Sequence, residues 1–251
     1  MKPPRILSIA GSDSSGGAGI QADIKTITML GGYAMTAITA ITAQDTTGVH
    51  AVETLSPAMV SAQIDACVDD IGVDAVKIGM LGSAEIAHVV ADRLERLSAP
   101  IVFDPVMVAT SGSVLADSGT IAAFERLMKL ATVTTPNVPE LQALGGDAGM
   151  ERRAVAYLAK GGDAEGAVVM DGLVVPGKEP VVWHSPRIDT PHSHGTGCTL
   201  STAIAVHLAQ GMDLETAIGR AREFVRAALL AAPGFGKGRG PMGHQAVRAE
   251  R

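Results

Sequence analysis

Short, almost uninterrupted apolar runs recur along the chain and alternate with longer segments that carry helix signals. Such runs lack the polar–apolar alternation of half-exposed strands and are typical of parallel strands covered on both faces. The predicted strands are Arg5–Ala10, Met35–Ala43, Ala75–Ile78, Ile101–Phe103, Thr132–Thr134 and Ala167–Met170. The pattern therefore predicts a mostly parallel sheet buried between layers.

Helices are predicted between these strands from their capping residues. They run from a cap at Ser56 to Gly72, from Ser83 to about Leu97, from Asp117 or Ser118 to about Leu130, from Gly197 to Gln210, and from a cap at Asp213 to about Ala232. Strands that alternate with helices indicate a doubly wound α/β sheet with right-handed crossovers. Because no repeat or domain-sized change of composition is present, residues 1–251 are expected to form a single domain.

Composition narrows the class of protein. The chain is 47% hydrophobic but only 3% aromatic, so its core is expected to be aliphatic, and its net charge of −6 without a basic stripe argues against a nucleic-acid partner. No apolar run approaches the roughly 18 residues of a membrane span, and Ile6–Ala10 is too short for a signal peptide. A cytoplasmic location is therefore expected, and the two cysteines provide no disulfide framework.

A glycine-rich turn, Gly11–Gly19, follows the first predicted strand and precedes a helix. It is neither a Walker loop nor a dinucleotide fingerprint, so it is either a flexible turn or a place where backbone approaches a ligand. Asp23 in the following helix either complements the helix dipole or contacts a ligand at the carboxyl edge of the sheet. Gln44 lies at the same edge and offers both a donor and an acceptor.

A second glycine-rich segment, His194–Cys198, precedes a long apolar helix. Free N–H groups at such a helix start, together with the helix dipole, make an anion site that can stabilise a transferring phosphoryl group. The same field is expected to lower the pKa of Cys198, although a small packing residue is the alternative interpretation. Cys67 lies on the apolar face of a predicted helix and is interpreted as a packing residue.

Six segments in order along the chain resemble the signatures of one family. They are Ala10–Asp23, Ile41–Gln44, Lys77–Leu81, Asp104–Met107, Thr135–Glu140 and His194–Ser201. On these segments the chain resembles the hydroxymethylpyrimidine/phosphomethylpyrimidine kinases of thiamine biosynthesis, which belong to the ribokinase-like superfamily. The resemblance implies a three-layer α/β/α sandwich that uses ATP and Mg²⁺ to phosphorylate the pyrimidine twice, as a homodimer.

The resemblance also implies roles for individual residues. On the substrate side, Asp23 and Gln44 hold the pyrimidine edge, with Gly11, Met80 and Val106 lining the pocket. At the helix start, Gly195, Thr196, Gly197 and Cys198 form the anion hole, and Cys198 stands where sugar kinases of the superfamily carry a base. On the nucleotide side, Asn137 and Glu140 position phosphates and Mg²⁺, Asp104 is a further metal-side carboxylate, and Lys237 lies near the phosphates.

One departure from the family pattern bears on nucleotide binding. Many members carry Lys-Gly-Gly-His after the strand that is predicted here to end at Met170, where this chain reads Asp171-Gly172. The resemblance therefore predicts a missing basic contact to the nucleotide. Two rival functions remain open: a pyridoxal kinase of the same superfamily, and a catalytically silent ligand-binding protein that kept the fold.

Overall fold

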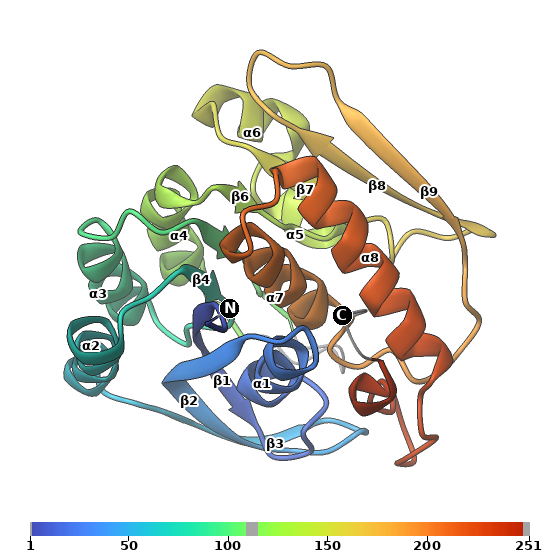
Figure 1. Cartoon of the computed structure of the whole chain (residues 1–251), viewed down its shortest axis with the longest axis horizontal. Helices are drawn as coiled ribbons and strands as arrows, with labels where there is room; N and C mark the ends of the chain where they lie inside the picture. The colour runs from blue at the N-terminus through green and yellow to red at the C-terminus, as the bar shows by residue number, and fades with distance from the viewer. Residues whose placement is uncertain (1, 109–114, 248–251) are drawn as a thin grey trace.

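The computed structural model describes residues 2–108 and 115–247, which form one nine-stranded sheet with helices on both faces (Figure 1). Across the sheet the strand order is β3-β2-β1-β4-β5-β6-β7-β8-β9. The strands are β1 (Arg5–Asp13), β2 (Tyr33–Gln44), β3 (Val49–Thr54), β4 (Ala75–Ile78), β5 (Ile101–Phe103), β6 (Val133–Thr134), β7 (Tyr157–Ala159), β8 (Val168–Val174) and β9 (Val181–Pro186).

The six strands from β2 to β7 in the sheet order run parallel, and β3, β8 and β9 run antiparallel to their neighbours at the two edges. The helices are α1 (Gly19–Met29), α2 (Pro57–Ala66), α3 (Ala84–Leu94), α4 (Ser118–Leu130), α5 (Val138–Ala143), α6 (Gly146–Arg153), α7 (Thr196–Ala209) and α8 (Leu214–Leu230), with short helical turns η1 (Cys67–Ile71) and η2 (His244–Ala246).

Two apolar clusters hold the three layers together. One cluster packs Ile64 of α2 and Phe124 of α4 against the sheet, and the other packs Ile27 of α1 and Phe224 of α8 against its opposite face. Figure 1 shows α1, α7 and α8 together on the near side of the sheet. The predicted α/β/α architecture with a mostly parallel sheet is confirmed.

Capping side chains begin the helices where the sequence predicts them. Ser56 accepts a hydrogen bond from the Met59 amide, Ser83 from Ile86, Asp117 from Thr120 and Asp213 from Thr216. The first of these helices differs from the prediction at its end, because α2 gives way after Ala66 to the π-helical turn η1. Gly72 then ends that turn in the left-handed region, at a φ of 81°.

A strand is present near the predicted Ala167–Met170, but the prediction that it is buried is wrong. Val168 and Met170 are 49% and 55% exposed, because β8 and β9 extend the sheet beyond the helices that cover its centre. The parallel strand at this point of the fold is β7, which the sequence analysis does not predict. Strands β3 and β9 and helices α5 and α6 are also absent from the prediction, since all are short or lie at the sheet edge.

The topology places several chain segments at one edge of the sheet. The parallel strands β1, β2, β4, β5 and β6 all end there, and α7 begins there and packs against β1, β4 and β5. Residues that follow different strands are thereby collected into one place. In the described ranges, no helix is long and apolar enough to cross a membrane.

Candidate active site

A cleft of about 1120 Å³ opens at this edge of the sheet. It is large enough to hold a small ring together with a nucleotide. Most residues that the sequence analysis assigns to the site line it: Gly11, Gln44, Met80, Asp104, Val106, Asn137, Glu140, Gly195, Thr196, Gly197 and Cys198. Two assigned residues, Asp23 and Lys237, are not among its lining residues.

The proposed ring pocket lies at the ends of β1, β2 and β4. A side chain at Gly11 would collide with the Met80 methyl group, since a Cβ there would lie 2.6 Å from Met80 Cε. The absence of a side chain at Gly11 therefore keeps this wall of the pocket open. The Gln44 amide lies between two polar groups, 3.3 Å from Thr42 Oγ1 and 3.2 Å from the Nε2 atom of His194.

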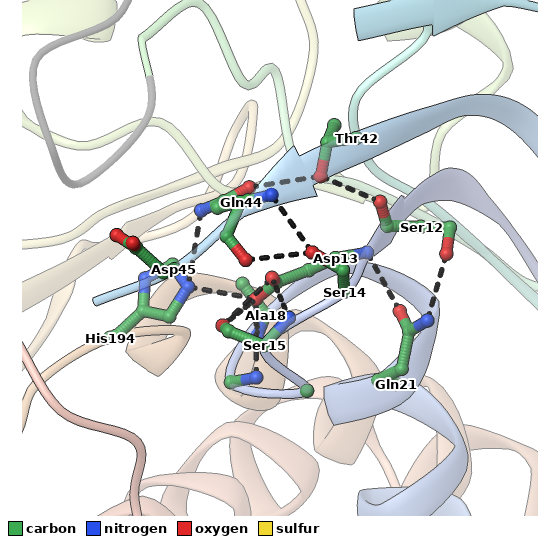
Figure 2. Close-up of polar contacts among 12 residues, drawn as sticks. Ser12, Asp13, Ser14, Ser15, Ala18, Gln21, Thr42, Gln44, Asp45 and His194 are labelled. Carbon is green, nitrogen blue, oxygen red and sulfur yellow. Dashed lines mark hydrogen bonds and ion pairs between the residues drawn. The ribbon is translucent and has the colours of Figure 1, made fainter. Parts of the chain in front are cut away.

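Asp13, at the end of β1, holds the glycine-rich turn together (Figure 2). Its Oδ1 atom accepts hydrogen bonds from the amide and hydroxyl of Ser15, both at 2.8 Å. Its Oδ2 atom accepts from the amides of Gly17 and Ala18 at 3.1 and 2.8 Å and contacts His194 Nε2 at 2.8 Å. Burial would raise the pKa of Asp13, but the hydrogen bonds from His194, Ser15 and Ala18 keep it below its usual value.

The glycine-rich turn also packs directly on the loop that precedes α7. A Cβ at Gly17 would overlap the His194 ring, and a Cβ at Gly195 would overlap the carbonyl of Gly17. Gly195 moreover adopts a φ of 86°, which strongly favours glycine. The two glycine-rich motifs, which lie far apart in the sequence, are thus in direct contact and together form one wall of the cleft.

The start of α7 is the segment at which the sequence analysis predicts an anion site. Gly195 is the N-cap, so the N–H groups of the first turn that follows have no acceptor within the helix. With the helix dipole, this turn attracts a negatively charged group. The site adjoins the acidic side of the cleft, because a Cβ on Gly197 would lie 3.5 Å from Asp104 Oδ2.

Cys198 lies in the first turn of α7, but its predicted low pKa is wrong for this structure. Burial raises the pKa of the Cys198 thiol to about 11, although the Lys77 charge opposes the shift. Desolvation of the thiolate therefore outweighs the Lys77 charge and the hydrogen bond from the Gly19 amide.

Beside the start of α7, where a Cβ on Gly197 would lie 3.2 Å from its Nζ atom, Lys160 links two carboxylates. Its Nζ atom lies 2.6 Å from Asp104 Oδ1 and 3.9 Å from Glu140 Oε2. Asp104 is also held by the Thr135 hydroxyl at 3.1 Å. Burial and the Asp104 charge, opposed by Lys160, raise the pKa of Glu140 to about 7. Asn137 and Glu140 form a capping box at the start of α5: the Asn137 side chain accepts from the Glu140 amide, and the Glu140 side chain accepts from the Asn137 backbone amide.

Lys160 corrects the prediction of a missing basic residue. The Lys-Gly-Gly sequence is present as Lys160-Gly161-Gly162, and only the histidine is replaced, by Asp163. The prediction is wrong because it places the motif after the strand that contains Met170, whereas the motif follows β7.

The structure corrects the assignment of Asp23 to substrate recognition. Asp23 is fully buried, and its carboxylate accepts hydrogen bonds from Lys77 Nζ at 2.9 and 3.1 Å, from Ser8 at 2.5 Å and from Thr202 at 2.7 Å. Burial would lower the pKa of Lys77, but the Asp23 charge raises it above its usual value. The carboxylate therefore faces a buried lysine, and Asp23 is not among the residues that line the cleft.

Lys237 is also placed differently from the prediction. Its backbone amide contacts Thr46 Oγ1 at 3.1 Å and its side chain is exposed, whereas Arg239 of the same segment lines the cleft. Three further arginines, which sequence reasoning missed, also line it: Arg187, Arg222 and Arg226. Their only signal in the sequence is their positive charge.

Arg187 contacts the loop that follows Lys160. It donates to the carbonyls of Gly162 at 2.8 Å and of Gly166 at 2.6 Å, and thereby braces the loop that follows Lys160.

Comparisons with known proteins agree with this geometry. A model of the phosphomethylpyrimidine kinase family matches residues 13–243. The hydroxymethylpyrimidine/phosphomethylpyrimidine kinase of Rhizobium meliloti is 48% identical over 255 residues, which cover 95% of this chain and 96% of that protein.

Solved structures extend the likeness to three dimensions. The phosphomethylpyrimidine kinase of Clostridium difficile matches with a TM-score of 0.76 at 38% identity, covering 90% of this chain and 99% of that one. The pyridoxal kinase of Staphylococcus aureus, solved with AMP-PCP and pyridoxal, matches with a TM-score of 0.87 at 32% identity, covering 98% and 95%. The predicted ribokinase-like fold and kinase class are confirmed, and the chain belongs to the phosphomethylpyrimidine kinase family.

Proposed function

We propose that this chain transfers the terminal phosphoryl group of ATP to hydroxymethylpyrimidine, and then a second phosphoryl group to the monophosphate, in thiamine biosynthesis. The observation that carries the proposal is the position of the anion site. The start of α7 lies in one cleft with the ring pocket beside Gln44 and with the Lys160 group. A phosphoryl group held at this helix start would be in reach of both the substrate and the nucleotide.

Gln44 is the residue that we propose reads the pyrimidine ring. Its amide can accept from the ring's amino group and donate to a ring nitrogen. Asp23 takes no part, because its carboxylate is buried against Lys77. Met80 and Val106, both lining the cleft, would cover the faces of the ring with apolar surface.

At the other end of the ring pocket, the first turn of α7 would receive the transferring group. Its N–H groups would stabilise the charge on the equatorial phosphoryl oxygens. Cys198, in the same turn, is the proposed group beside the substrate hydroxyl. Burial raises the pKa of its thiol, so the neutral side chain would orient the substrate hydroxyl, and it would have to release the thiol proton to solvent before it could accept the proton of that hydroxyl.

Lys160 and its carboxylates are the proposed nucleotide side of the site. Binding of AMP-PCP by the pyridoxal kinase of similar structure supports ATP as the phosphoryl donor. Within the described residues, no three histidine, cysteine or acidic side chains gather as a metal site. Asp104 and Glu140 therefore fit Mg²⁺ that is held mainly by phosphate oxygens and water, which is how proteins commonly bind this ion. The ion would neutralise phosphate charge during transfer.

The proposal is tested by identifying the products. The purified chain is incubated with ATP, Mg²⁺ and hydroxymethylpyrimidine, and the products are followed by phosphorus NMR. Sequential appearance of the monophosphate and the diphosphate is expected. Release of ADP without either product would contradict the proposal.

Pyridoxal phosphorylation is the second candidate, and it is favoured by one observation. The pyridoxal kinase solved with its substrate covers nearly the whole chain at a TM-score of 0.87, although its 32% identity is lower than the 48% of the Rhizobium relative. Both substrates are aromatic rings that carry a hydroxymethyl group. The ring edge beside Gln44 distinguishes them, because pyridoxal offers a phenolic oxygen and an aldehyde instead of an amino group.

A homodimer and a cytoplasmic location remain proposals that rest on the resemblance. Strand β2 exposes Tyr33 and Ile41, each by 50%, and exposed apolar side chains of this kind suit a contact between two copies. Sedimentation velocity tests the assembly, and a species of monomer mass at micromolar concentration would contradict it.

A further inference from the structure

The Asp13 carboxylate is the most heavily bonded group in the cleft wall, yet the proposed chemistry does not use it. It is only 3% exposed and receives six hydrogen-bonding contacts, five from residues 15–18 and one from His194. All of these contacts require an acceptor. An ionised carboxylate satisfies them, because it accepts at both oxygens and donates at neither.

This acceptor determines the state of the His194 ring. Because Asp13 Oδ2 only accepts, the Nε2 atom of His194 at 2.8 Å must carry a proton. The same Nε2 atom faces the amide nitrogen of Gln44 at 3.2 Å. Two donors do not bond to one another, so a half-turn of the Gln44 amide, which places its oxygen toward His194, removes the donor–donor contact and makes that oxygen a second, weaker acceptor for the proton that Nε2 donates to Asp13.

The other end of the Gln44 amide agrees with that orientation. Thr42 Oγ1 lies 3.3 Å from this end and donates its own proton to the Ser12 carbonyl at 2.9 Å. The hydroxyl oxygen is therefore free to accept from the Gln44 NH₂ group. The chain of contacts from Asp13 through His194 to Gln44 fixes which end of the amide is the donor (Figure 2).

We propose that Asp13 is a positioning residue that acts through His194 to set the direction of the Gln44 amide and to lock the glycine-rich turn onto the loop before α7. The substrate ring and the anion site would then keep a fixed position relative to one another. This inference rests on the proposed role of Gln44 in reading the ring. It makes Asp13 and His194 determinants of substrate choice, although neither is needed to bind the nucleotide.

Asp13→Asn is the variant that tests this inference. It preserves the shape of the side chain but offers only one acceptor oxygen. Either the amides of the glycine-rich turn or the His194 Nε2 atom therefore loses its acceptor. The KM for hydroxymethylpyrimidine is expected to rise about tenfold or more, because bonds to charged groups contribute that much to binding. The KM for ATP is expected to change less than about twofold, since Lys160 and Asp104 are held by other contacts.

Asp45 provides a matched control on the surface. Its Oδ1 atom accepts from the Thr47 amide and hydroxyl and from the Gly48 amide, and its Oδ2 atom pairs with His50 at 2.9 Å. It therefore repeats the same turn and the same histidine contact, but its side chain is 57% exposed and it does not line the cleft. Asp45→Asn is expected to change neither KM by more than about twofold.

Rescue at His194 separates positioning from bulk packing. His194→Gln places an amide donor near Asp13 and is expected to retain at least about a third of kcat/KM. His194→Ala is expected to lose as much as Asp13→Asn. Both damaging variants are expected to reduce the preference for hydroxymethylpyrimidine over pyridoxal, because a Gln44 amide that turns freely no longer selects one ring edge.

Two kinetic outcomes would overturn the inference. One is Asp13→Asn kinetics like those of the Asp45→Asn control, and the other is an equal loss for hydroxymethylpyrimidine and for ATP together with a lowered melting temperature. The wild type decides the proposed function separately. If it phosphorylates pyridoxal instead, the same KM comparison is made with pyridoxal. Hydrogen exchange adds a readout that needs no activity, and exchange of the amides at residues 15–18 that is unchanged in Asp13→Asn would also overturn the inference.

Discussion

Replacing Lys77 by methionine should destabilise the protein strongly. The ammonium group is fully buried and donates to both oxygens of Asp23, at 2.9 and 3.1 Å. Methionine fills a similar volume but leaves the Asp23 carboxylate buried with only the hydroxyls of Ser8 and Thr202 as partners. The variant thus isolates one loss, the neutralising charge.

The size of the effect follows from desolvation. Removing one partner of a buried ion pair typically costs about 3–5 kcal/mol, because the remaining charge stays out of water. The two hydroxyl bonds offset part of this cost, so a loss of about 3 kcal/mol in the free energy of unfolding is expected. Replacing both residues, as Asp23→Leu with Lys77→Met, should cost less than the sum of the single changes, since no buried charge remains.

Urea unfolding followed by circular dichroism measures these differences. Arg220→Met is the control, because the Arg220–Glu223 pair has side chains that are 61% and 69% exposed, and its loss should cost no more than about 1 kcal/mol. A loss below about 1 kcal/mol for Lys77→Met, or strictly additive single changes, would refute the reasoning. If Lys77→Met does not fold, recovery of folding in the double variant still tests it.

Three further predictions concern the site and its surroundings. Cys198→Ala should leave the fold intact and reduce turnover by about 10²-fold or more, the usual contribution of acid–base catalysis, and near-normal turnover would favour a packing role. Lys160→Gln should raise the KM for ATP about tenfold or more, through the loss of a charge-assisted contact, while the KM for the pyrimidine changes little; equal effects on both would contradict the assignment. Burial and the Lys25 charge lower the pKa of His244 to about 4, so the folded state binds fewer protons than the unfolded state below about pH 6.5. The unfolding free energy should therefore fall by about 2 kcal/mol more between about pH 7.5 and about pH 5 in the wild type than in His244→Gln, and identical pH profiles would refute this.

The central sheet and the helix starts could be predicted because their signals are local. Ser56, Ser83 and Asp213 lie beside the amides that they cap, so the sequence alone places those helix starts correctly. Strands β4 and β5 agree with prediction residue for residue, because continuous apolar runs suit a sheet covered on both faces.

The errors concern contacts between residues that are distant in the sequence. Asp23 looks like a ligand group until Lys77, 54 residues away, is found against it in the folded chain. Asp13 and His194 are 181 residues apart, and nothing in either motif shows that they touch. Lys160 escaped notice because the strand before it has only three residues, too few to show a period.

The most direct test of the central claim is the ratio of kcat/KM for hydroxymethylpyrimidine to that for pyridoxal. Both are measured by ADP release at one pH and one saturating concentration of ATP with Mg²⁺. With Gln44 reading the ring edge, the pyrimidine is expected to be preferred at least about tenfold, a difference of roughly 1.4 kcal/mol. An equal or reversed ratio would contradict the account, and a reversed ratio would identify the chain as a pyridoxal kinase.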